Sequence, residues 1–190
     1  MNAYILVGGR SRRMGAAKAG IRFGETTLLG RVVAAASGAF DRVIAVQRPG
    51  GEAAGIETIH EEPHEDEAPI FGVACALRHA SAKCFVIAVD YPLLSAEALR
   101  DLAALFEASA APMLVPVWNS IPQVLCAGYA PSLVTQIDAQ IALRKYDLQS
   151  LAAEAERVEV SGETWRSVNT IEELEEVRRW HEQQRFLASR

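Results

Sequence analysis

The sequence predicts a three-layer α/β/α fold with helices on both faces of a mostly parallel, mixed sheet. Short runs rich in Val, Ile and Leu alternate with longer stretches in which apolar residues recur at helical spacing. Several of these runs are continuously apolar, as in FVIAV at 85–89. Such runs are typical of parallel strands covered on both faces, because a strand with one solvated face alternates apolar and polar residues.

The expected strands are separated by helical stretches everywhere except at the end of the series. They cover residues 4–7, 42–47, 57–60, 84–89, 113–118 and 124–129. The last two lie too close together for a helix between them, so we expect a hairpin around residues 119–122. This hairpin makes the sheet mixed.

The expected helices cover residues 26–37, 71–79, 95–107, 131–141 and 171–186. The last one carries its own start signal. Thr170 followed by Glu173 fits the capping box, in which each side chain satisfies a free backbone N–H group of the other residue. This helix should therefore begin next to Asn169.

Length and composition favour one domain over residues 1–190 and narrow the function. Half of the 190 residues are apolar, and no linker, repeat or low-complexity segment divides the chain. The net charge of −5 argues against a general nucleic-acid binder. No basic leader and no apolar run approaching the ~20 residues of a membrane span are present. The 3 cysteines are widely spaced, as expected of reduced thiols. We expect a soluble, cytoplasmic protein with no membrane or nucleic-acid partner.

The chain opens with an unusual loop, GGRSRRMGAAK at 8–18, directly after the first strand. It is not a P-loop, because Lys18 is followed by Ala19 in place of a magnesium-binding hydroxyl, and it lacks the dinucleotide pattern GxGxxG. Glycines in this position expose backbone N–H groups at the carboxyl end of a strand, where α/β proteins hold phosphates. Arginines in a loop are often only solvated, but next to these glycines they favour phosphate binding; they are Arg10, Arg12 and Arg13.

A single acidic residue, Asp90, ends the fourth expected strand in the segment FVIAVDYP. Pro92 disfavours helix at position 91, so the carboxylate should lie at the edge of the sheet, facing the crevice. There it can hold Mg²⁺. The alternative is that Asp90 only caps the turn or the helix that begins after Ser95.

Two histidines, His60 and His64, lie close to the acidic residues of the segment 61–69, which contains two prolines. Their spacing is irregular for a metal site. We expect this segment to be a mobile, solvated loop.

Several segments together resemble the molybdenum cofactor guanylyltransferase family. Besides the opening loop they are APIFG at 68–72, VDYPLLS at 89–95, IPQVLCAGY at 121–129 and SVNTIEELEE at 167–176, in the family's order. The resemblance spans nearly the whole chain and implies a Rossmann-like nucleotidyltransferase fold. It also implies transfer of GMP from GTP to the terminal phosphate of molybdenum-bound molybdopterin, with release of pyrophosphate and Mg²⁺ as the essential cofactor. Transient contact with cofactor-delivery proteins or molybdoenzymes is a further implication.

The resemblance also implies site residues. The catalytic set is Arg13, Lys18, Asp90 and Asn169, with Asp90 as the metal ligand. The nucleotide-binding set is Leu6, Val7, Gly8, Gly9, Arg13, Lys18, Glu61 and Asp90. Glu61 stands where the family often has an aspartate. Cations suit this chemistry because the reactants and the leaving pyrophosphate are all negatively charged.

The chain departs from the family pattern at Ala17, where aspartate is common, and at Ser167, where asparagine is common. Both changes remove polar groups, which leaves open a divergent paralogue that binds a nucleotide or the cofactor without catalysis. A cytidylyltransferase of the same cofactor is also open, because base choice rests on a few hydrogen bonds. A sugar-phosphate nucleotidyltransferase has a similar opening loop, but the short chain argues against it.

Overall fold

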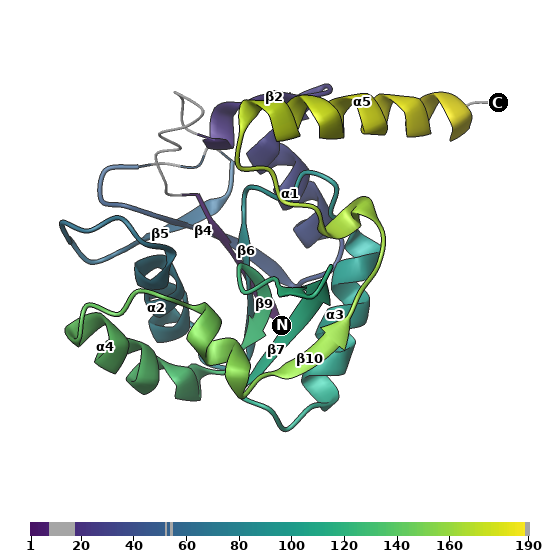
Figure 1. Ribbon diagram of the computed structural model, residues 1–190. Helices are drawn as coiled ribbons and strands as arrows, with labels where there is room; N and C mark the ends of the chain where they lie inside the picture. The colour runs from purple at the N-terminus through teal and green to yellow at the C-terminus, as the bar shows by residue number, and fades with distance from the viewer. Residues whose placement is uncertain (8–17, 52, 54, 189–190) are drawn as a thin grey trace.

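A computed structural model describes residues 1–7, 18–51, 53 and 55–188, and these form a mixed, mostly parallel eight-stranded sheet (Figure 1). The order across the sheet is β10-β7-β9-β6-β1-β4-β5, and β8 pairs with β7. Only β9 and β8 run antiparallel to their neighbours. The strands are β1 (Asn2–Leu6), β4 (Arg42–Gln47), β5 (Glu57–His60), β6 (Cys84–Ala88), β7 (Met113–Trp118), β8 (Ile121–Pro122), β9 (Cys126–Tyr129) and β10 (Glu156–Glu159). The predicted sheet type is confirmed.

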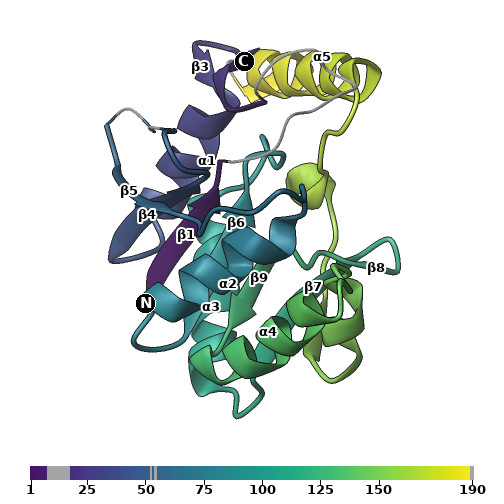
Figure 2. The same cartoon turned by 90° about the vertical axis from the view of Figure 1, so that its left-hand side faces the viewer.

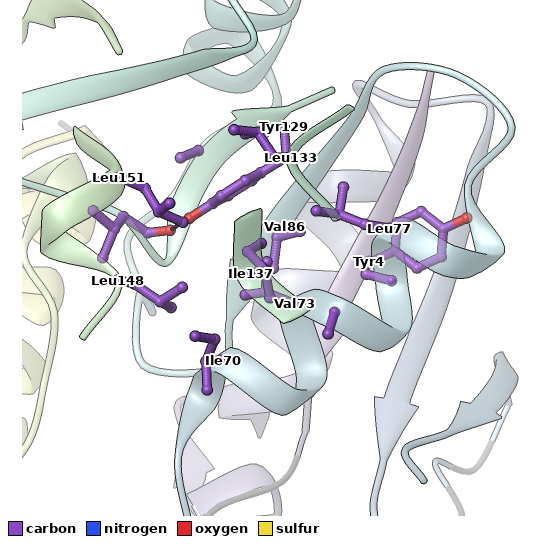
Figure 3. Packing of buried hydrophobic residues seen from close by; sticks show 14 of the residues in the cluster. Tyr4, Ile70, Val73, Leu77, Val86, Tyr129, Leu133, Ile137, Leu148 and Leu151 are labelled. Carbon is purple, nitrogen blue, oxygen red and sulfur yellow. Dashed lines mark hydrogen bonds between the residues drawn. The ribbon is translucent and has the colours of Figure 1, made fainter. Parts of the chain in front are cut away.

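Helices cover both faces of this sheet, so the predicted three layers are confirmed (Figure 2). One face packs against α1 (Leu28–Ser37) and α3 (Ala96–Ala108), and the other against α2 (Pro69–His79) and α4 (Val134–Ala142). Successive residues of β1 serve opposite faces: Ala3 and Ile5 belong to the α1 side, Tyr4 and Leu6 to the α2 side. Figure 3 shows the α2 side, with Val73 and Leu77 of α2 among the buried side chains.

The last helix, α5 (Ile171–Ala188), lies above the carboxyl edge of the sheet and projects beyond the helices beneath it (Figure 1). It packs on a small hairpin of β2 (Arg22–Phe23) and β3 (Thr26–Thr27) through Phe23 and Val177. Its capping box is confirmed: Thr170 Oγ1 accepts from Glu173 N at 3.2 Å, and Glu173 Oε2 accepts from Thr170 N at 3.1 Å. The start of α5 is therefore held in place by its own sequence.

The expected elements are present, with small shifts at their ends. Thr27 caps α1, so this helix begins at Leu28 and not at residue 26. The predicted hairpin is confirmed: Asn119 and Ser120 have φ of 51° and 64°, as a two-residue type I′ turn requires, and Trp118 pairs with Ile121. The prediction missed β2, β3, β8, β10 and the short 3₁₀ helices η1 (Lys18–Gly20), η3 (Gln149–Ala153) and η4 (Glu163–Trp165). The helix expected at 131–141 begins as a 3₁₀ turn, η2 (Pro131–Leu133), and continues as α4.

The order in which the chain adds strands to the sheet reverses at β1, and a ligand site is expected at such a reversal. From β1 the chain moves outward to β4 and β5, then returns through α2 to β6 on the other side of β1. Leu6 pairs with Val46 on one side and with Ala88 on the other, so the carboxyl ends of these strands meet at one edge. Open α/β sheets bind ligands at such a reversal.

Within the described ranges, no helix combines the length and the apolar character that crossing a bilayer needs. Cys75, Cys84 and Cys126 are free, as expected.

Candidate active site

Asp90 lies just beyond β6, at the carboxyl edge beside the end of β1. Its side chain is 14% exposed. The atom Oδ1 is buried and has no hydrogen-bond partner among the residues that the structure describes. Burial raises the pKa of the Asp90 carboxyl, and the nearby Lys18 ammonium opposes this shift. The carboxylate is thus costly to keep ionised unless a further cation approaches it.

Lys18 joins three segments that are far apart in the sequence. Its Nζ lies 3.7 Å from Asp90 Oδ2 and donates to Asn169 Oδ1 and to the carbonyl oxygen of Val168, both at 3.0 Å. The Lys18 side chain is 17% exposed, so the charge is partly shielded from water. Three of the four residues expected to be catalytic therefore lie together.

Asn169 is held by the start of α5. Its backbone N–H donates to Glu173 Oε2 at 2.6 Å, and the Val168 N–H donates to the Asp90 carbonyl oxygen at 2.8 Å. Val168 is fully buried beside Leu93, which follows the Asp90 segment. Ser167 adds little, because the distance from Asn169 Nδ2 to Ser167 Oγ is 3.5 Å. The side-chain amide of Asn169 is thereby fixed beside Lys18.

The expected nucleotide-binding residues of the first strand lie at the same edge. Val7 donates its N–H to the Val46 carbonyl oxygen at 3.0 Å and so extends β1 by one residue. The remaining predicted residues of the opening loop fall outside the described residues: Gly8, Gly9, Arg10, Arg12, Arg13 and Ala17. Both neighbours of this segment, Val7 and Lys18, are at the carboxyl edge.

Glu61 follows β5 and reaches back towards the end of β1. A Cβ atom placed on Gly72 of α2 would lie 2.9 Å from Leu6 Cδ2 and 3.0 Å from Glu61 Oε1. Glu61 and Leu6 thus approach the same face of α2, and only a glycine leaves room for both. Gly72 was not among the site residues predicted from the sequence, although a glycine near the start of an otherwise good helix is a signal of close packing.

His64 is not solvated, so that expectation is wrong for this residue. It is 13% exposed, its Nε2 lies 2.7 Å from Glu61 Oε2, and its ring stacks on Phe71 with centroids 3.8 Å apart. The reason is that the His64 ring packs on the apolar face of Phe71 of α2. The residues next to His64 in the sequence do not predict this contact. Within the described residues, no group of three or more His, Cys, Asp or Glu side chains is arranged to hold a metal ion.

Comparisons with known proteins agree with this geometry. Residues 3–159 match the family described as MobA-like NTP transferase domain. A probable molybdenum cofactor guanylyltransferase of Mycobacterium avium is 31% identical over 164 residues, covering 81% of this chain and 82% of the relative. One from Thermococcus kodakarensis is 29% identical over 191 residues, 92% of each chain. The crystal structure of molybdopterin-guanine dinucleotide biosynthesis protein A from Archaeoglobus fulgidus matches with a TM-score of 0.82 at 24% identity, covering 96% of this chain and all of that one.

Proposed function

Because the chain belongs to the MobA-like NTP transferase family and is a nucleotidyltransferase, we propose that it transfers GMP from GTP to the terminal phosphate of molybdenum-bound molybdopterin. Pyrophosphate is the second product. The names of the relatives support the choice of GTP and of this acceptor. The observation that carries the proposal is that Lys18 and Asp90 meet beside the end of β1, where a sheet of this topology binds its ligand.

The reaction joins two anions, and the site residues are suited to that difficulty. A phosphate oxygen of the acceptor attacks the α-phosphorus of GTP, and the bond to pyrophosphate breaks as negative charge grows on the leaving group. In our proposal Lys18 and Arg13 place positive charge against the phosphate oxygens, and Asn169 orients the Lys18 ammonium. We also propose that the nucleotide contacts Leu6, Val7, Gly8, Gly9 and Glu61.

The residues present fit Mg²⁺ at Asp90. Oδ1 is a buried carboxylate oxygen without a partner among the described residues, and Mg²⁺ prefers such oxygen ligands. A single protein carboxylate is enough, because this ion commonly keeps waters and takes the rest of its ligands from phosphates. When bound, Mg²⁺ would neutralise part of the phosphate charge. Asp90 would hold it, and Lys18 would balance the carboxylate from the other side.

Pyrophosphate release tests the proposal directly. The protein is incubated with Mg²⁺, molybdenum-loaded molybdopterin and one of GTP, CTP, ATP or UTP. We expect release with GTP only. Release with CTP only would replace the base assignment by that of a cytidylyltransferase. Nucleotide binding without any release, under conditions in which a known guanylyltransferase works, would overturn the enzymatic proposal in favour of a binding protein.

A further inference from the structure

A hollow of about 270 Å³ lies between the hairpin of β2 and β3 and the middle of α5, which lie side by side in Figure 1. Three arginines and one glutamate are among its lining residues, which include Arg22, Phe23, Arg178, His181, Glu182 and Arg185. His181 lies about 15 Å along the helix axis from Ile171, the first residue of α5. This arginine groove is therefore distinct from the contact between Lys18 and Asp90.

The cations of the arginine groove converge from two elements. Arg178, His181 and Arg185 follow one another at helical spacing, so they line the same side of α5. Arg22 belongs to β2 and comes from the other wall. The Nη2 atom of Arg178 donates to the Arg22 carbonyl oxygen, which holds the two walls together. A ligand in the groove is thus within reach of guanidinium groups from both walls.

The arginine groove has an apolar floor. Phe23 is 1% exposed, and its ring centroid lies 5.4 Å from that of His181. Arg31 of α1 also contacts this ring, with Cζ 5.6 Å from the centroid. Buried apolar surface keeps water away from one side of the groove, so charges there are screened less than on an open surface.

The positive charges around the groove act on one another. Burial lowers the pKa of His181, the charges of Arg31 and Arg185 lower it further, and Glu182 opposes this shift. The pKa of Arg31 is lowered as well, first by burial and then by Arg185. Both shifts indicate like charges that the neighbouring carboxylates do not fully neutralise. An anion bound between these cations would relieve the repulsion.

The carboxylates near the groove leave its arginines accessible. Glu25 lies 3.5 Å from Arg185 and is 88% exposed, and Glu175, which pairs with Arg178, is 51% exposed. Ion pairs exposed to this degree contribute little to stability, so a ligand can replace them. Arg22 forms no ion pair within the ranges that the structure describes.

We propose that the arginine groove is a second anion site of this protein and binds a small polyvalent phosphate ligand, of the size of pyrophosphate. Three arginines against one glutamate leave an excess of two positive charges in the lining, which a monovalent anion would not balance. A guanidinium group binds phosphate through two parallel N–H donors. A tetrahedral phosphoryl group directs its oxygens towards both walls at once, whereas a carboxylate has two oxygens in one plane. The volume of about 270 Å³ is below the range of about 300–1,000 Å³ that is typical of pockets for drug-sized ligands, so it suits a small anion.

A titration of the isotope-labelled protein with pyrophosphate, followed by NMR without Mg²⁺ or nucleotide, tests this inference. We expect the backbone amide signals of residues 22–24 and 178–185 to shift saturably, with a dissociation constant below about 1 mM. Malonate, a small dicarboxylate, should bind more weakly than pyrophosphate. Equal or tighter binding of malonate would overturn the phosphate assignment.

Arg22→Gln and Arg185→Gln each remove one cation of the groove and should raise the dissociation constant of pyrophosphate by roughly tenfold. Both arginines are exposed, so neither substitution should change the unfolding temperature. Arg179→Gln is the matched control, because Arg179 is exposed on the same helix but does not line the groove. It should bind pyrophosphate like the unsubstituted protein. Unchanged signals at residues 22–24 and 178–185, or equal affinity in all three variants, would overturn the inference and leave the proposed function intact.

Discussion

The ammonium group of Lys18 faces the carboxylate of Asp90 at 3.7 Å, and the two residues come from segments that follow adjacent parallel strands. Lys18 Nζ also donates hydrogen bonds to Val168 and Asn169, just before α5. One side chain from the N-terminal part of the chain thus contacts both the C-terminal segment and the edge of the sheet. Separate substitutions of Asp90 and Lys18 therefore test the proposed roles of the two residues.

Asp90→Asn should abolish Mg²⁺-dependent pyrophosphate release without lowering the temperature of unfolding. The amide keeps the shape of the carboxyl group, and burial already disfavours the ionised carboxylate, as its raised pKa indicates. Release as a function of Mg²⁺ concentration and thermal denaturation measure the two effects. Asp101→Asn, on the exposed face of α3, is the control and should change neither. Unaltered Mg²⁺ dependence in Asp90→Asn would show that the metal assignment is wrong.

Lys18→Ala should weaken GTP binding by roughly tenfold or more, because a charge-assisted contact to phosphate is lost. Transfer should slow as well, since the ammonium group that Asn169 orients against the phosphate oxygens is removed. Titration calorimetry and steady-state kinetics separate binding from turnover. Lys145→Ala removes an exposed lysine near α4 and serves as the control. Equal affinity for GTP in both variants would contradict a phosphate role for Lys18.

Gly72→Ala should lower the free energy of unfolding by about 1–3 kcal/mol, because the new methyl group meets Leu6 at 2.9 Å and Glu61 at 3.0 Å. This loss runs against the general gain of about 1 kcal/mol that alanine brings to a helix. Gly20→Ala is a suitable comparison, since a Cβ there would meet nothing within 4 Å. Urea denaturation of both variants gives the answer. A Gly72→Ala protein as stable as the unsubstituted one would mean that Leu6 and Glu61 move aside freely.

The stability of the protein should fall as His181 becomes protonated. Its pKa is lowered from the ordinary 6.5, first by burial and then by the charges of Arg31 and Arg185. A lowered folded-state pKa stabilises the protein above the unfolded value, and this contribution is lost as the pH falls through the folded-state value. His181→Gln should therefore flatten the decline in unfolding temperature between about pH 7.5 and about pH 5. An identical decline in both proteins would assign the effect to other groups.

The order of strands and helices could be predicted because it depends on local chemistry. Continuous apolar runs such as that of β6 need two covered faces, and the Thr170–Glu173 box places the start of α5 within a residue. The strand β10 was missed because its local sequence carries no strand signal. Its sequence ERVE is mostly charged and exposed, and it becomes a strand only because the edge of β7 is available to pair with it.

For the candidate site too, some features could be predicted from the sequence and others could not. Residue types and spacing predicted Lys18 and Asp90 as site residues, and the family resemblance added Asn169 and Glu61. They did not reveal that Gly72 leaves room for Glu61, and they led to a wrong expectation for His64. The packing of α2 on the sheet determines both positions, and its partners come from β1, β5 and the loop beyond.

The sequence by itself determined the layered α/β architecture, the hairpin and the cap of α5, because each of these follows from neighbours along the chain. Only the tertiary structure decided which residues touch: Lys18 with Asp90 and Asn169, and His64 with Glu61. The physical reason is that such contacts depend on how α5 packs at the carboxyl edge of the sheet and on how α2 packs against its face. That packing is a property of distant apolar surfaces, which a local pattern does not contain.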